Sequence, residues 1–141
     1  MSTAILYYSL GGTTKKYCEK LAAETGANAF EVKERTRRNM LTAFIPGCMQ
    51  AAGGKASRIV DPGVDFGKYD EIVIAGPIWA GNPAPAVNAI IALLPPGKTV
   101  TLVTICGSGS YDPKRAAEAV RVRGCTLKES RSLTAKDAAA G

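Results

Sequence analysis

The chain has 141 residues and a mass of 14.7 kDa, which suits a single domain over residues 1–141 and leaves no room for a second core. Hydrophobic residues make up 46% and charged residues 21%, a balance that excludes a disordered or fibrous chain. The net charge of +6 favours an anionic ligand, an acidic partner or weak adhesion to nucleic acid, and a solvated basic face explains it equally well.

The sequence has no histidine, and its four cysteines form no C-x-x-C pair. We therefore expect no metal site and no catalytic triad built on an imidazole, so any chemistry would come from a cofactor or from carboxylates. The longest apolar stretches, such as residues 87–94, are far shorter than the roughly 20 residues of a membrane span. With no signal peptide at the N-terminus, we expect a cytoplasmic protein without a membrane segment.

The first third of the chain follows the order strand, loop, helix, strand. Residues 3–8 form an apolar, β-rich run, and a loop of small and hydroxyl residues covers positions 9–14. Apolar residues at helical spacing then predict a helix that ends at Gly26, and residues 29–32 predict a short strand. This order predicts a βαβ unit.

The middle of the chain is less regular until residue 71. A helix is predicted over residues 39–52, although Pro46 and Gly47 interrupt it. The continuous apolar run 71–75 predicts a central strand that is buried on both faces. Residues 76–85 contain three prolines and two glycines, so we expect no regular structure there, and Pro85 suits the first turn of a helix.

The last third repeats the same alternation. A helix carrying Val87, Ile90 and Leu94 is stopped by residues 95–97, and residues 100–105 predict a strand rich in β-branched side chains. After a small-residue loop, Asp112 as the N-cap and Pro113 at the first helical position predict a helix that ends near residue 124, followed by a strand over 125–133.

The alternation predicts an α/β fold: a doubly wound open sheet of five parallel strands in the order 2-1-3-4-5, with right-handed crossovers. The last helix of such a fold is short or missing, because residues 132–141 are few and rich in alanine and glycine. One face of the sheet would then be under-covered. We expect either a stub helix over residues 135–140 or burial of that face in a homodimer.

The loop after the first strand has the composition of a phosphate site. It offers the hydroxyl groups of Ser9, Thr13 and Thr14 and backbone N–H groups freed by Gly11 and Gly12, at the N-terminus of a helix. Such residues also cap helices for purely structural reasons. The P-loop and dinucleotide-binding motifs are absent, which argues against nucleoside triphosphates and dinucleotides as ligands of this loop.

Three loops together resemble those of the flavodoxins: residues 8–14, residues 76–85 and residues 107–111. The resemblance implies FMN, with its phosphate in the first loop and its ring against the other two, and it implies electron transfer rather than acid–base catalysis by a side chain. Trp79 and Tyr111 would flank the two faces of the ring. The residues that the resemblance implies at the cofactor are Ser9, Leu10, Gly11, Gly12, Thr13, Thr14, Pro77, Ile78, Trp79, Ala80, Gly81, Asn82, Cys106, Gly107, Ser108, Gly109 and Tyr111.

The resemblance implies a carrier whose flavin cycles between the oxidised, semiquinone and hydroquinone states. Two alternatives remain open: a small FMN-dependent NAD(P)H:quinone-type reductase, and a flavin-free interaction module of the same fold. Flavodoxins are usually acidic, so the net charge of +6 points to an acidic redox partner or to anionic substrates. The basic segment 33–38 would attract such a partner or a dinucleotide phosphate, or it is a solvated loop; no motif for specific nucleic-acid binding is present.

Overall fold

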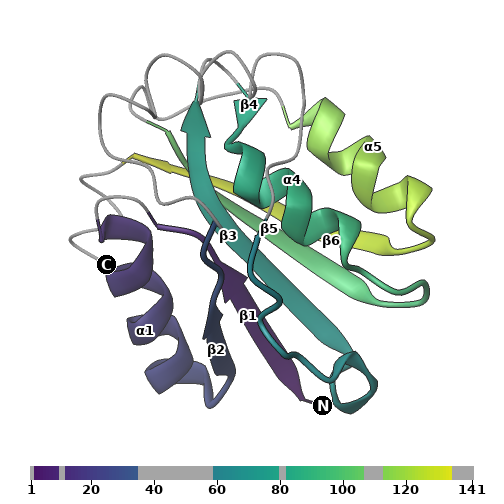
Figure 1. Cartoon of the computed structure of the whole chain (residues 1–141), viewed down its shortest axis with the longest axis horizontal. Coiled ribbons are helices and arrows are strands. Elements are labelled where there is room, and N and C mark those ends of the chain that lie inside the picture. Colours follow the sequence, from purple (N-terminus) through teal and green to yellow (C-terminus); the bar gives the residue numbers. More distant parts are fainter. Residues whose placement is uncertain (1, 10–11, 35–58, 80–81, 107–112, 135–141) are drawn as a thin grey trace.

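A computed structural model describes residues 2–9, 12–34, 59–79, 82–106 and 113–134 of the chain. Six described strands form one sheet (Figure 1). The strands are β1 (Thr3–Tyr7), β2 (Asn28–Glu31), β3 (Glu71–Trp79), β4 (Asn82–Pro83), β5 (Thr99–Cys106) and β6 (Thr126–Thr134). The helices are α1 (Thr13–Thr25), the 3₁₀-helix η2 (Phe66–Lys68), α4 (Pro85–Ala92) and α5 (Lys114–Val122).

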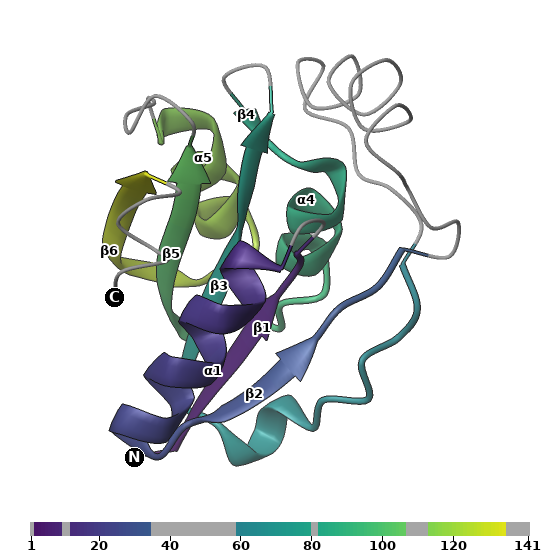
Figure 2. The same cartoon turned by 90° about the vertical axis from the view of Figure 1, so that its left-hand side faces the viewer.

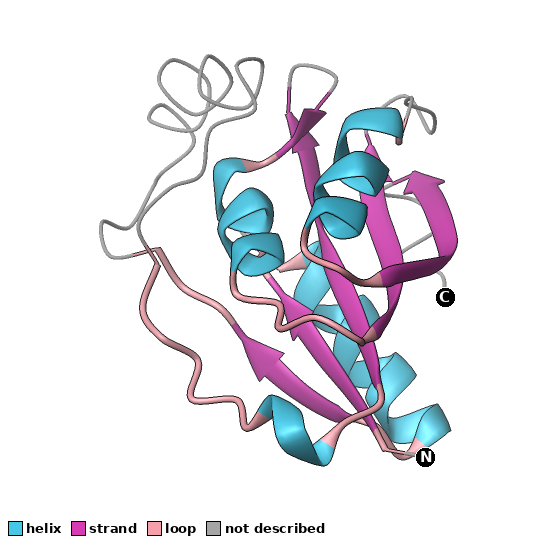
Figure 3. Ribbon diagram, turned by 90° about the vertical axis from the view of Figure 1, so that its right-hand side faces the viewer, coloured by secondary structure: helices cyan, strands magenta, loops and turns pink. Residues whose placement is uncertain are grey.

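The sheet has the strand order β2-β1-β3-β5-β6, and all of these strands pair in parallel. Counted along the chain without the two-residue β4, this is the order 2-1-3-4-5, so the predicted topology is confirmed. Helices α4 and α5 lie on one face of the sheet and α1 on the other (Figures 2 and 3). We call these two sides the α4–α5 face and the α1 face.

The α4–α5 face holds most of the buried apolar side chains. Ile72 and Ile74 of β3 and Leu102 of β5 pack there with α4 and α5, and each is at most 1% exposed. The α1 face has a smaller buried cluster, to which β3 contributes Ala75 and β5 contributes Val103. Because β3 buries residues on both faces, it is the central strand that its continuous apolar run predicts.

The helix boundaries follow from local chemistry. Gly26 ends α1 in the left-handed conformation at φ 75°, which glycine adopts at little steric cost, and its N–H donates to the Ala22 carbonyl. Pro85 opens α4, as predicted. The first N–H groups of a helix have no acceptor within the helix, so proline, which has no N–H, loses no hydrogen bond at this position. The described part of α5 begins one residue later than predicted: Pro113 is the cap residue rather than the first helical residue, and its carbonyl accepts from the Ala117 N–H.

The expectation of irregular structure over residues 76–85 is also wrong. Strand β3 continues to Trp79, and β4 turns back against it in an antiparallel pair. Pro77 is tolerated because it stands near the end of β3, where its carbonyl accepts from the Ala84 N–H and the strand loses little by lacking a donor.

The C-terminal strand β6 has the predicted length of nine residues but begins and ends one residue later than predicted. The predicted helix over residues 39–52, the stub helix over residues 135–140 and the Asp112 cap lie outside the described residues. Within the described part of the chain, α1 alone covers the α1 face, and no helix there is long and apolar enough to cross a membrane.

Candidate functional site

The carboxyl ends of the three central strands meet at one edge of the sheet (Figure 1). Tyr7 of β1 pairs with Ala75 of β3, and Ala75 pairs with Val103 of β5. β1 ends at this level, and β3 and β5 stay paired for two more residues, so all three strands end at the same edge. The strand order reverses between β1 and β3. In open α/β sheets, ligands bind outside the carboxyl ends at such a reversal, so this edge is the candidate site.

The first loop bends sharply into α1. Gly12 adopts φ 91°, a left-handed conformation that a side chain would strain, and it stands directly before the helix. Its N–H donates to the Ser9 hydroxyl over 2.9 Å, and its carbonyl accepts from the Lys16 N–H over 3.0 Å. The Ser9 oxygen therefore helps to fix the loop, and its own proton has no acceptor among the described residues.

The N-terminus of α1 lacks the usual compensation for its positive dipole end. Its first turn has no acidic residue, and no side chain caps it. Within the described residues, the N–H groups of Thr13 and Thr14 also have no acceptor. A helix end in this state favours a bound anion.

Thr14 adds a second observation to the first. The residue is 3% exposed, and its hydroxyl makes no hydrogen bond within the part of the chain that the structure describes. Leaving a buried hydroxyl without a partner costs about 1–3 kcal/mol, so such groups are rare unless a ligand or water completes them. The first loop thus carries an unsatisfied donor at the place where the phosphate is predicted.

The middle loop is a hairpin rather than an irregular turn. Ile78 pairs with Pro83, and Trp79 pairs with Asn82, so the backbones of Trp79 and Asn82 face each other at its end. The side chains of Trp79 and Asn82, and the tip residues between them, lie outside what the structure describes. The hairpin projects from β3 beyond the neighbouring strands (Figure 2).

The base of this hairpin is packed closely against α4. A Cβ atom at Gly76 would stand 2.2 Å from Cγ2 of Val87, so only glycine fits without displacing the helix. Pro83, Ala84 and Pro85, which lead into α4, are buried. This close packing fixes the hairpin relative to the sheet.

Part of the predicted site cannot be compared with the structure. Cys106 ends β5 and pairs with Thr134, but its side chain is not among the described atoms. The predicted site residues outside the described ranges are Leu10, Gly11, Ala80, Gly81, Gly107, Ser108, Gly109 and Tyr111. For these residues the roles implied by the resemblance remain predictions.

Sequence reasoning missed Tyr8. Its phenol donates to Oε1 of Glu34 over 2.6 Å, and the residue is 5% exposed. Glu34 forms an antiparallel bridge with Ile59, which joins the two ends of segment 35–58 beside the carboxyl edge. The available signal was an aromatic residue directly before the Ser-Leu-Gly-Gly loop, but the sequence could not identify its partner 26 positions away.

Two titratable groups on the α1 face stay protonated near neutral pH. Burial raises the pKa of Tyr7 to about 12, with the nearby Glu31 and Glu19 carboxylates adding to the shift. Burial alone raises the pKa of the Cys18 thiol to about 12. Neither group is therefore a nucleophile or a base at neutral pH.

Exposed basic side chains surround the candidate site. Lys15 and Lys16 lie in the first turn of α1, Lys33 follows β2, and Lys114 and Arg115 open α5. Lys15 is partly compensated by Glu31, 3.8 Å away on β2. We call these five residues the basic rim.

The proteins found to be similar to this chain are solved structures. No family model and no curated protein matches it. A flavoprotein from Lactobacillus acidophilus, solved in complex with FMN, is 25% identical and has a TM-score of 0.76, with 92% of this chain and 91% of that one covered.

Two further structures share the fold at lower sequence identity. A presumed flavoprotein from Bacteroides uniformis is 19% identical with a TM-score of 0.82, and the match covers 99% of this chain and 96% of that one. The two-electron reduced flavodoxin of Megasphaera elsdenii is 18% identical with a TM-score of 0.58, and 99% of each chain is covered. The chain has the flavodoxin-like fold, as the resemblance of its loops implies.

Proposed function

We propose that this chain binds FMN at the carboxyl edge of its sheet and serves as an electron-transfer protein. The observation that carries the proposal is the N-terminus of α1, where a buried Thr14 hydroxyl and the first N–H groups of the helix lack partners among the described residues. The Lactobacillus relative, whose structure holds FMN, supports the choice of ligand.

The residues present fit the phosphate end of FMN. Hydroxyl and backbone N–H donors at a helix N-terminus bind a phosphate dianion through charge-assisted hydrogen bonds. Thr13, Thr14 and the Ser9 hydroxyl would supply these donors. Because Gly12 has no side chain, the phosphate would reach the helix end unobstructed.

Bound FMN would supply one- and two-electron redox chemistry, which no side chain of this sequence provides. The chain would contribute binding, orientation and the exclusion of water. The β3–β4 hairpin, held by Gly76 against α4, would place Trp79 and Asn82 next to the ring. No described residue at this edge needs to gain or lose a proton for electrons to pass.

The partner in this proposal is acidic. The basic rim surrounds the edge through which electrons would pass, and the whole chain carries a net charge of +6. Opposite charges steer encounter and raise association rates, an effect that salt weakens. Oxidation of the reduced protein by the anion ferricyanide should therefore slow with added salt, and Lys114→Glu should slow it further at low salt; a rate independent of both would contradict an acidic partner.

The first test is an FMN titration of the purified protein and its Thr14→Val variant, followed by flavin absorbance and fluorescence. Valine keeps the shape of threonine but removes the unpartnered hydroxyl. We expect FMN affinity to fall about tenfold or more while thermal stability without FMN stays equal or rises. Riboflavin, which lacks the phosphate, should bind weakly to both proteins.

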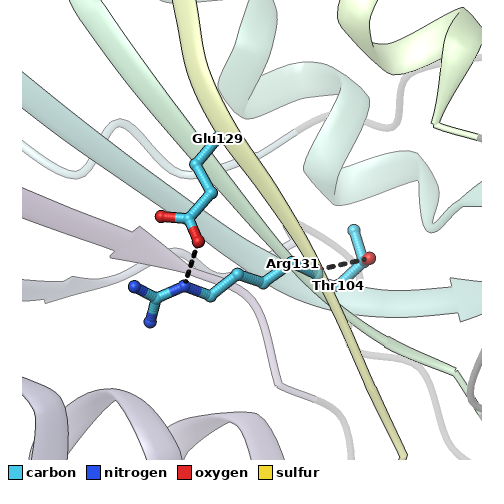
Figure 4. Close-up of polar contacts among 3 residues, drawn as sticks. All are labelled: Thr104, Glu129 and Arg131. Carbon is cyan, nitrogen blue, oxygen red and sulfur yellow. Dashed lines mark hydrogen bonds and ion pairs between the residues drawn. The ribbon is translucent and has the colours of Figure 1, made fainter.

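Thr104→Val is the matched control. Thr104 is 1% exposed, but its hydroxyl already donates to the Arg131 carbonyl over 3.1 Å (Figure 4). Its loss should lower stability by about 1 kcal/mol and leave FMN affinity unchanged. If the wild-type chain holds no FMN even in excess, the proposal fails and the flavin-free module becomes the better reading.

A second measurement separates the carrier from the reductase. The FMN-loaded protein is mixed with NADH or NADPH and a quinone, without any partner reductase. A carrier shows no steady oxidation of the nicotinamide. Steady turnover would overturn the carrier and establish the reductase alternative.

A further inference from the structure

Strand β6 forms one edge of the sheet (Figure 1). It runs for nine residues, and within the described part of the chain only β5 pairs with it. Lys128, Glu129 and Arg131 on this strand are exposed. Long edge strands offer unpaired backbone groups to another strand, and charged side chains decide which strands they accept.

The charges on β6 lie in a particular order. Nε of Arg131 donates to Oε1 of Glu129 over 2.9 Å, so the two side chains lie on the same side of the strand (Figure 4). Ser130 stands between them. Leu133, two residues beyond Arg131 on the same strand, packs into the cluster under α1, so Glu129 and Arg131 lie on the α1 face. The hydrogen bond with Glu129 and, to a smaller extent, the neighbouring Tyr17 hold the pKa of Arg131 above its ordinary value.

This order is self-complementary. When two copies of β6 run antiparallel with a two-fold axis at Ser130, Glu129 of each copy stands directly opposite Arg131 of the other. Directly opposed residues in antiparallel strands share one face of the sheet, as these two do. The two contacts are identical by symmetry, as a two-fold interface requires.

We propose that β6 pairs with β6 of a second copy of this chain, joining the two sheets edge to edge through reciprocal Glu129–Arg131 contacts. The proposal is independent of FMN binding. A second copy fits this edge because Glu129 and Arg131 of one strand are complementary in charge to Arg131 and Glu129 of the other.

The same charges fix the register. A shift of two residues in one direction opposes Glu129 with Glu129, and a shift in the other direction opposes Arg131 with Arg131. Like charges directly opposite one another destabilise a pair of strands. A one-residue shift would turn one copy over, so that the α1 face of one sheet adjoined the α4–α5 face of the other and Glu129 no longer stood opposite Arg131.

The interface is short. The register with β5 slips between Val100 and Thr101, which makes Lys128 the extra residue of a bulge and limits regular pairing to the stretch around Ser130. Leu127 and Leu133 already pack into the clusters of their own chain on opposite faces. A contact of this size lies at the small end of specific interfaces, so the dimer is weak and depends on concentration.

The test measures self-association by sedimentation velocity from ~10 µM to ~1 mM protein, for the wild type and two charge reversals. Glu129→Arg opposes arginine with arginine in both contacts, and Arg131→Glu opposes glutamate with glutamate. Each should raise the dissociation constant about tenfold or more. An equimolar mixture of the two variants restores both opposite-charge contacts, so it should form a heterodimer as tightly as the wild type dimerises.

Glu118→Arg is the matched control, because it makes the same reversal in an exposed ion pair with Arg121 on α5, at 3.8 Å. Circular dichroism and thermal unfolding confirm that each variant is folded. A wild type that stays monomeric up to ~1 mM overturns the proposal. So does a dimer that survives both reversals, or a mixture that fails to recover association although each variant is folded.

Discussion

The two faces of the sheet are built differently. On the α4–α5 face, two helices and side chains such as Ile74, Leu102 and Val120 form an extensive apolar core. On the α1 face, α1 covers the strands β1, β2 and β3, and the part of that face on β6 carries the exposed Glu129–Arg131 ion pair next to the partly buried Leu133. Neighbouring residues of one strand therefore meet very different surroundings.

This difference separates stability from function. The apolar face holds the fold together and, through Gly76 and Val87, fixes the hairpin that borders the site. The α1 face carries the helix N-terminus proposed for phosphate, the buried Tyr7 and Cys18 groups, and the charged edge strand. In the two proposals above, FMN would bind at this helix N-terminus, and a second copy of the chain would pair with this edge strand.

The largest expected effect is a difference in stability between two core substitutions on β3, one on each face of the sheet. Ile74 of β3 is fully buried on the α4–α5 face, whereas its neighbour Val73 is only partly buried on the α1 face. Ile74→Ala should lower the free energy of unfolding by about 2–5 kcal/mol, and Val73→Ala by about 1 kcal/mol. Urea unfolding of both variants measures the difference.

Val103→Ala sharpens this comparison, because Val103 is 1% exposed on the α1 face. A loss intermediate between those two is expected. If Val73→Ala costs as much as Ile74→Ala, the two faces contribute equally and the contrast drawn above is wrong.

Much of the fold could be predicted from the sequence because its signals are local. The apolar runs at residues 3–8, 71–75 and 100–105 became β1, β3 and β5, and Gly26 and Pro85 mark helix ends by their own backbone chemistry. Parallel strands with short connections then leave few possible orders. The strand order could therefore be predicted from the alternation of strands and helices, without knowledge of any tertiary contact.

The failures come from contacts that local sequence does not encode. Three prolines in residues 76–85 predict irregular structure, yet the segment pairs with itself because the pairing of Trp79 with Asn82 needs no proline N–H. The bond from Tyr8 to Glu34 joins residues 26 positions apart. The Glu129–Arg131 pair was overlooked because a charged edge strand resembles any solvated segment.

The candidate site divides in the same way. Glycine and hydroxyl residues before a helix predict an anion site, and Gly12 and the α1 N-terminus have the geometry for one. Composition could not reveal that Thr14 is buried without a hydrogen-bond partner among the described residues, since burial depends on the packing of α1 against the sheet. The Thr14 hydroxyl therefore distinguishes this loop from an ordinary helix cap, and its substitution tests the proposed site.

An intermediate effect is expected at alkaline pH, where Cys18 on the α1 face titrates. Its pKa rises from 9.0 to about 12 on folding, so the folded protein keeps a proton that the unfolded chain loses above pH 9. Stability should fall by up to about 1.4 kcal/mol per pH unit between these two values, and Tyr7 adds to the fall from its ordinary pKa of 10.0 upward.

Unfolding of the wild type and Cys18→Ala across this pH range measures the contribution. The variant should show a shallower decline, whatever its stability at neutral pH. Equal slopes for the two proteins would mean that the thiol does not titrate as its burial requires, and that the small core under α1 is more open than the structure indicates.

The smallest effect is expected where charges replace apolar packing. Nζ of Lys128 lies 3.3 Å from Oε1 of Glu71, and the two side chains are 56% and 27% exposed. Solvent screens such pairs, so Glu71→Gln should change the free energy of unfolding by about 0.5 kcal/mol or less, in low or high salt. Glu118→Gln, which breaks the exposed pair on α5, should do the same. A loss of stability above about 1 kcal/mol at Glu71 alone would contradict this expectation. Only an ion pair shielded from water contributes that much, so ion pairs would then stabilise the α1 face substantially, as the helices α4 and α5 stabilise the opposite face.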